Sequence, residues 1–168
     1  MPKWLRTYVR AVEAVNYRIG RVAMYLLFVI MGIMLWSSIT KIGRVPALWT
    51  LEMAQFTLVA YYMLGAPYSL QLGSNVRMDL LYSRLNTRGQ AIWDVFTVFC
   101  LMFYIGVMLW GAFDSTVYAF QTGERNPTAW RPPLWPIKVI ITFSFLLMLL
   151  QATVHLIRDI AVIRGEEI

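Results

Sequence analysis

Four long runs of uncharged residues constrain this chain more than any other feature of its sequence. The longest run, 53–76, holds 24 residues, and a helix of that length extends about 36 Å. The runs 22–40, 95–113 and 139–157 hold 19 residues each. A helix needs about 20 apolar residues to cross the hydrocarbon core of a bilayer. The four runs therefore predict four transmembrane helices.

The composition also indicates a membrane protein. Hydrophobic residues make up 59% of the 168 residues and charged residues only 14%, whereas soluble domains carry about 25% charged residues. The net charge of +6 could suggest nucleic-acid binding. The basic residues, however, flank the apolar runs and form no separate basic face. We therefore expect an all-α membrane protein with one domain over 1–168 that binds lipids and no nucleic acid.

The segment 4–20 has the pattern of an amphipathic helix. Apolar residues such as Trp4 and Val12 recur at helical spacing on one face, opposite Arg10 and Glu13. This pattern predicts an interfacial helix that lies in the headgroup plane with its basic side toward anionic lipids. The alternative is a short helix packed on the bundle.

The distribution of lysine and arginine predicts the orientation of the chain. The two terminal segments and the loop between the second and third spans hold ten basic residues, whereas the other two loops hold five. The more basic side faces the cytoplasm, so both termini are expected there. The loop between the second and third spans is then cytoplasmic as well. Its residues 78–85 are expected to form a short amphipathic helix.

The second span has the features of a closely packed helix. Gly65, Ser69 and Gly73 fall four residues apart and form a stripe of small residues on which another helix could pack. Pro67 has no backbone N–H, so it should kink the helix or leave a carbonyl for a neighbour to bond. We therefore expect this span to lie at the centre of the bundle.

Few residues could carry chemistry. Cys100 and His155 are the only cysteine and histidine; we expect Cys100 to be a core residue and His155 to lie near an interface. Glu52, Asp94 and Asp114 lie at span ends, where solvated carboxylates are expected. No catalytic, metal or cofactor site is therefore expected. Neutral polar residues within the spans are expected to form hydrogen bonds between helices: Gln55, Thr57, Gln71, Thr97, Thr142 and Gln151.

The outer loop 121–138 contains four prolines, which prevent a regular helix and stiffen the segment. Such a loop could dock a partner or could simply cap the bundle.

Taken together, these features resemble the small, DctQ-like membrane subunit of the tripartite ATP-independent periplasmic (TRAP) transporters. The segment 75–81 is similar to a motif that follows the second span in that family, with Asn75 in place of the family's histidine. Arg77 and Asp79 match this motif and are expected to pin the cytoplasmic end of the span. The segments 130–138 and 149–151 are also similar to the family.

The resemblance implies a non-catalytic scaffold that holds a large membrane subunit in the bacterial inner membrane. The large subunit would carry the substrate and sodium sites for symport of an organic acid, and this chain would hold no cofactor of its own. A periplasmic binding protein would deliver the solute to the outer face. The charged residues of the outer loops are the candidates for docking it: Lys41, Arg44, Glu124, Arg125 and Arg131.

The residues also leave two alternatives open. The first is a stand-alone four-span transporter; such exporters place an acidic residue within a span, and the first span here has none. The second is a membrane redox subunit, for which one histidine and one cysteine supply few ligands.

Overall fold

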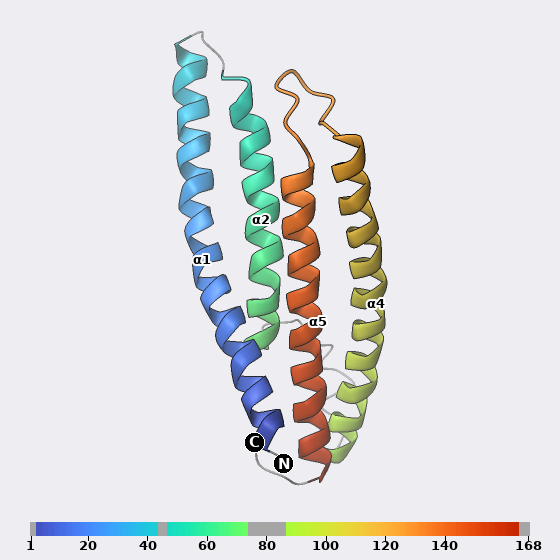
Figure 1. Ribbon diagram of the computed structural model, residues 1–168. Helices are drawn as coiled ribbons and strands as arrows, with labels where there is room; N and C mark the ends of the chain where they lie inside the picture. Colours follow the sequence, from blue (N-terminus) through green and yellow to red (C-terminus); the bar gives the residue numbers. More distant parts are fainter. Residues whose placement is uncertain (1–2, 44–46, 74–86, 165–168) are drawn as a thin grey trace.

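The computed structural model describes residues 3–43, 47–73 and 87–164. Within them the chain forms four helices: α1 (Lys3–Ile42), α2 (Trp49–Gln71), α4 (Thr87–Thr122) and α5 (Trp135–Arg164). Successive helices run in opposite directions, so α1 begins and α5 ends at the same end of the bundle (Figure 1). The prediction of an all-helical protein is confirmed.

Three of these helices are long and apolar enough to cross a membrane: Trp4–Ile42 in α1, Trp93–Thr122 in α4 and Trp135–Ala161 in α5. The second predicted span, α2, is not among them. Its sequence includes glutamine, tyrosine, serine and proline residues as well as Glu52, and these lower its hydropathy. α2 nevertheless has 23 residues, which corresponds to about 34 Å of helix, and it lies alongside its neighbours (Figure 1).

The segment 4–20 does not form a separate helix, so this part of the prediction is wrong. It is the first half of α1, which continues without a break through 40 residues. Its apolar face packs on the end of α5, where Val9, Val12 and Val154 form a small buried cluster. The alternative, a segment packed on the bundle, describes this arrangement better because its apolar residues Val9 and Val12 are buried against α5.

The sequence predicts that the second span lies at the centre of the bundle. In the structure α5 occupies this place, because it contacts all three other helices. α5 packs extensively against α4 and α2 and also contacts α1. Residues along its length are fully buried, including Ser144, Gln151 and Ala152. α1 and α4 lie at the two edges of the row of helices (Figure 1).

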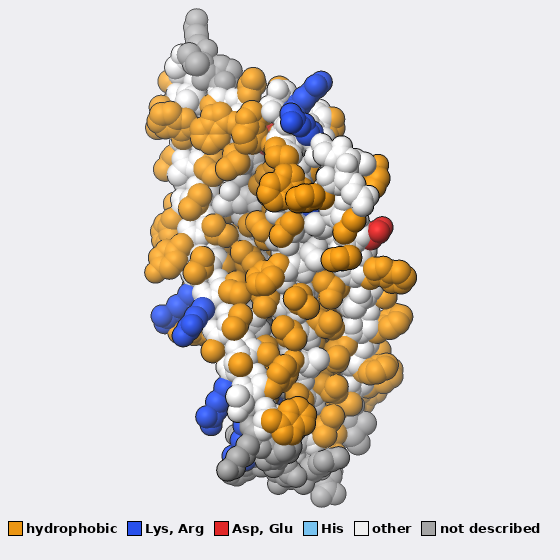
Figure 2. All heavy atoms as spheres, in the orientation of Figure 1, with side chains coloured by type: hydrophobic (Ala, Val, Ile, Leu, Met, Phe, Trp, Pro, Cys, Tyr) orange, Lys and Arg blue, Asp and Glu red, His pale blue; other side chains and the backbone are white. Residues whose placement is uncertain are grey.

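Hydrophobic side chains cover most of the visible face of the molecule (Figure 2). Large apolar residues on the edge helices are widely exposed; Phe103 is 72% and Trp110 77% exposed, for example. This surface is suited to lipid or to other membrane helices.

Several predicted features lie outside the described residues. They are Arg44, the motif residues Asn75, Arg77 and Asp79, and the expected helix over 78–85.

Candidate functional site

The proline in α2 is matched by a hydroxyl group from α5. Pro67 is buried inside the helix and cannot donate to the carbonyl oxygen of Met63, four residues earlier. The hydroxyl of Ser144, itself fully buried, donates a hydrogen bond to that oxygen. The prediction that Pro67 leaves a carbonyl for a neighbour is therefore confirmed, and the bond ties α2 to α5.

A second bond ties the end of α2 to α5. The Nε2 atom of His155 donates to the carbonyl oxygen of Leu70 at 2.9 Å. α2 ends at Gln71. Two residues later, Gly73 adopts a φ of +64°, and its N–H also bonds to the Leu70 carbonyl, at 3.0 Å. Glycine suits this left-handed conformation because it has no Cβ. His155 is thus a contact between helices, and Gly73 ends α2.

Side chains from α1 and α5 form a series of polar contacts. The Nδ2 atom of Asn16 donates to the Oε1 atom of Gln151 at 2.6 Å, and both residues are buried. The Tyr8 hydroxyl lies 2.8 Å from the hydroxyl of Thr153. Near the end of the bundle, Arg158 Nη2 lies 2.5 Å from Glu13 Oε1. Glu13, which the sequence pattern places with Arg10 on the side expected to face lipid headgroups, is thus paired with α5.

The closest approach between helices occurs at Gly20 of α1, which sequence reasoning missed. A Cβ atom at this position would lie 2.4 Å from Cγ and 2.5 Å from Cβ of Tyr68 on α2. At Gly65 and Gly73, by contrast, a Cβ would meet nothing within 4 Å. Within the described part of the chain, therefore, no other helix packs closely on Gly65 or Gly73 of the predicted small-residue stripe. No sequence signal marks Gly20, because its contact, Tyr68, lies on another helix.

The polar residues predicted to join helices behave differently from one another. Thr142 bonds to Thr116 of α4 at 2.9 Å, and Gln151 bonds to Asn16, so these two expectations are confirmed. Thr57 and Thr97 instead donate to carbonyl oxygens of their own helices.

The start of α2 carries a buried carboxylate. Glu52 is 5% exposed, and its Oε2 atom has no hydrogen-bond partner among the described residues. Beside it, Thr50 donates to the carbonyl of Ala47 at 2.8 Å and lies 3.1 Å from the Ser37 hydroxyl of α1. The expectation of a solvated carboxylate is wrong for Glu52, which is buried, whereas Asp114 is exposed as expected.

The loop after α4 is ordered by its own backbone. Residues Arg125 and Pro133 form an isolated bridge, and the N–H of Asn126 donates to the Pro132 carbonyl at 3.0 Å. Glu124 and Lys138 form an ion pair at 2.5 Å that fastens the loop to the first turn of α5.

The predicted docking residues of the outer loops lie in different environments. Arg125 and Lys41 are exposed, as is Arg131, which has a φ of 49°. Glu124 is engaged with Lys138.

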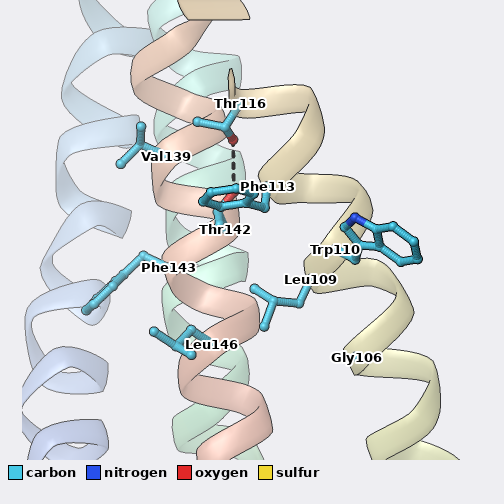
Figure 3. A pocket seen from close by; sticks show the side chains of 9 residues that line it. All are labelled: Gly106, Leu109, Trp110, Phe113, Thr116, Val139, Thr142, Phe143 and Leu146. Carbon is cyan, nitrogen blue, oxygen red and sulfur yellow. Dashed lines mark hydrogen bonds between the residues drawn. The ribbon is translucent and has the colours of Figure 1, made fainter. Parts of the chain in front are cut away.

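An apolar groove of about 680 Å³ lies between α4 and α5. Figure 3 shows Leu109 and Phe113 of α4 directed toward α5, and Phe143 directed away from α4. The Thr116 and Thr142 hydroxyls lie 2.9 Å apart, and each also lies within hydrogen-bond distance of a carbonyl oxygen of its own helix, at 2.7 and 3.0 Å, so that both hydroxyl protons have an acceptor. The groove therefore presents hydrocarbon to its surroundings.

Cys100 lies on the exposed surface of α4, so its expected place in the core is wrong. The described residues contain no group of three histidine, cysteine, aspartate or glutamate side chains that could hold a metal ion. Several polar groups inside the bundle, among them Asn16, Ser144 and Gln151, join one helix to another, which is the chemistry of a framework.

Comparisons with known proteins identify similar chains. Residues 30–162 match the family described as "Tripartite ATP-independent periplasmic transporters, DctQ component". The chain is 28% identical over 119 residues to the isethionate TRAP transporter permease protein DctMQ of Oleidesulfovibrio alaskensis. The aligned region is 71% of this chain and 18% of that protein, so the chain spans less than a fifth of the relative's length. No solved structure matches the chain.

Proposed function

The chain belongs to the DctQ family, the small membrane component of TRAP transporters, and on this premise we propose that it is a fixed scaffold for the large DctM subunit. In this role it holds the large subunit in the bilayer and helps a periplasmic binding protein to dock. DctQ components are not enzymes, and this chain contributes shape and rigidity to the complex.

The observation that carries the proposal is the way in which the buried polar groups are used. The Asn16–Gln151 and Ser144–Met63 bonds each join two helices. Hydrogen bonds of this kind in membranes contribute about 0.6 kcal/mol each on average, and they fix the helices in one register. A subunit that must stay still while its partner moves requires such a framework.

The proposed topology has four crossings, with the start of α1 and the end of α5 in the cytoplasm of a bacterial inner membrane. α2 is long enough to cross, and it packs between α1 and α5. The excess of lysine and arginine at the end where α1 begins supports this orientation. A cysteine introduced into the loop after α4 would test this orientation: it should react with a membrane-impermeant thiol reagent added to the outside of intact cells.

The outer ends of the helices are proposed to meet the binding protein. Lys41, Arg125 and Arg131 are exposed there, and Glu124 with Lys138 holds the loop that carries two of them. Arg44 is included from its place in the sequence. Each exposed pair contributes only about 0–1 kcal/mol, so single charge reversals should weaken docking slightly.

We expect the combined Lys41→Glu and Arg125→Glu variant to reduce uptake more than either single change. Arg10→Glu, an exposed reversal at the opposite end of α1, is the control and should leave docking unchanged. Uptake that tolerates reversals in both outer loops would argue against docking at this surface.

The transported solute is proposed to be an organic acid, moved by symport with sodium ions that bind in the large subunit. The similar permease from Oleidesulfovibrio alaskensis is named for isethionate. The test is uptake by proteoliposomes under a sodium gradient, with the chain alone, DctM alone, and both together in the presence of the binding protein. Uptake only with all components supports the proposal, whereas accumulation by the chain alone would identify a stand-alone transporter and overturn it.

A further inference from the structure

One face of α2 carries both exposed residues and polar side chains. The residues Leu51, Gln55, Leu58, Tyr62, Gly65 and Ser69 follow one another at steps of four and three, so they form one stripe, which we call the α2 seam. Leu51 is 59%, Leu58 42% and Tyr62 64% exposed, and Gln55 is exposed as well. Gly65 and Ser69 are half-buried.

The seam lies on the side of α2 that faces neither α1 nor α5. The contacts with those helices come from other positions: Tyr68 meets Gly20 of α1, and the Met63 and Leu70 carbonyls meet Ser144 and His155 of α5. At 100° per residue, the centre of the seam is turned well away from these positions. The described part of the chain therefore leaves the seam uncovered.

The side chains of the seam need hydrogen-bond partners that lipid cannot supply. Gln55, Tyr62 and Ser69 form no side-chain hydrogen bond within the described residues. Tyr62 lies about 20 Å along α2 from its start, near the middle of the helix. An amide or hydroxyl that faces hydrocarbon without a partner is costly. The α4–α5 groove differs, since its two threonines are already bonded and it can face lipid without cost.

We propose that the α2 seam is the surface on which a transmembrane helix of the large DctM subunit packs. Gly65, where a Cβ would meet nothing within 4 Å, leaves room for the close approach of that helix. Gln55, Tyr62 and Ser69 bond to polar side chains or backbone groups that the helix presents. The proposal rests on the proposed function and adds to it the face of this chain that is used.

Two observations favour DctM over other occupants. The polar groups of the seam require a protein and exclude hydrocarbon. In addition, the region that matches this chain in the similar DctMQ permease is 18% of a much longer polypeptide, so in that protein it is covalently joined to the rest of the permease. A second copy of this chain remains as an outcome that the test must separate.

The test is position-specific photocrosslinking in the complex of this chain with its cognate, tagged DctM. The photoreactive residue p-benzoylphenylalanine is placed at position 58 in the seam and, as controls, at positions 103 on α4 and 25 on α1. Phe103 and Tyr25 are 72% and 69% exposed, so the controls are at least as accessible as Leu58. We expect an adduct with DctM from position 58 and little from the controls.

The outcomes distinguish the two proposals. If the unmodified chain does not co-purify with DctM, the proposed function fails, and this inference fails with it. If the complex forms but position 58 yields only lipid adducts, or DctM is captured mainly from position 103 or 25, the seam is overturned while the scaffold function stands. An adduct of two 19.5-kDa chains from position 58 would assign the seam to self-association and overturn the proposal.

A matched pair of glycine variants supplies a second measurement. Gly65→Leu fills the seam, and Gly32→Leu places the same side chain on exposed α1, where a Cβ also meets nothing within 4 Å. Overpacking at a helix contact should lower the DctM recovered with Gly65→Leu about tenfold. Gly32→Leu should retain normal recovery, and both variants should elute as the wild-type chain does when purified alone. Equal recovery with the two variants would contradict the inference.

Discussion

Asn16 and Gln151 form a buried amide pair between the first half of α1 and the second half of α5, with Nδ2 and Oε1 2.6 Å apart. The remaining atoms, Asn16 Oδ1 and Gln151 Nε2, have no partner among the described residues. The pair therefore fixes which residues of the two helices face each other, and it does so with two polar atoms left unbonded.

Gln151→Leu should lower the thermal stability of the purified protein, because it leaves the whole Asn16 amide buried without a partner. The expected loss is about 1–3 kcal/mol. The double variant Asn16→Leu with Gln151→Leu should recover most of this loss, since both buried polar groups are then removed. Thermal unfolding in detergent, followed by gel filtration, measures both effects. A double variant as unstable as the sum of the single variants would show that the two amides act independently.

The bond from Ser144 to the Met63 carbonyl is required only because of Pro67. Ser144→Ala should therefore destabilise the protein by about 1 kcal/mol, since the carbonyl then lacks a donor. In a Pro67→Ala background the backbone N–H of residue 67 can bond to Met63, and Ser144→Ala should have little effect. The same unfolding assay applied to the four proteins of this cycle gives the coupling between the two positions. Absence of coupling would contradict the role assigned to Ser144.

Gly20→Ala should push α1 and α2 apart, because the new Cβ would lie 2.5 Å from the Cβ of Tyr68, an atom attached to the backbone that cannot rotate away. We expect a loss of about 1–3 kcal/mol. Gly32→Ala is the control on the same helix, where a Cβ meets nothing within 4 Å; it should be neutral or stabilise the helix by up to about 1 kcal/mol. Similar unfolding temperatures for the two variants would exclude a close contact at Gly20.

The ion pair between Glu124 and Lys138 should control the order of the outer loop more than the stability of the bundle. The side chains are 37% and 21% exposed, so Glu124→Gln should cost no more than about 1 kcal/mol. Release of the loop should nevertheless speed its cleavage by trypsin at Arg125, measured by mass spectrometry of the fragments. Arg131→Gln, which removes an exposed charge from the same loop and leaves the Arg125 site intact, should not speed cleavage at Arg125. Unchanged cleavage rates in Glu124→Gln would show that the backbone bonds of the loop suffice.

Several features of the fold could be predicted because they depend on local sequence. Uncharged runs of 19 residues and more require helices in a membrane, and Pro67 necessarily removes one donor from its helix. The partner of the Met63 carbonyl could not be predicted, because Ser144 lies 81 positions away. The same limit applies to Asn16, whose partner on α5 is separated from it by 135 positions.

Two predictions failed because a periodic pattern shows which residues share a face and does not show what that face meets. The amphipathic pattern of 4–20 fitted a helix on a membrane surface, yet the same face packs on α5 and continues into α1. Glu52 occupies a span end, as solvated residues do, yet its side chain is buried.

By itself, the sequence determined that this protein is a helical membrane component of the DctQ type, since hydropathy and motif order are properties of the chain alone. Only the tertiary structure decided that α5 is the central helix, that Gly20 and not Gly65 is the close contact within the chain, and that the α2 seam is left uncovered. The physical reason is that burial and hydrogen bonding between helices depend on their relative rotation and register, which local sequence periodicity leaves undetermined.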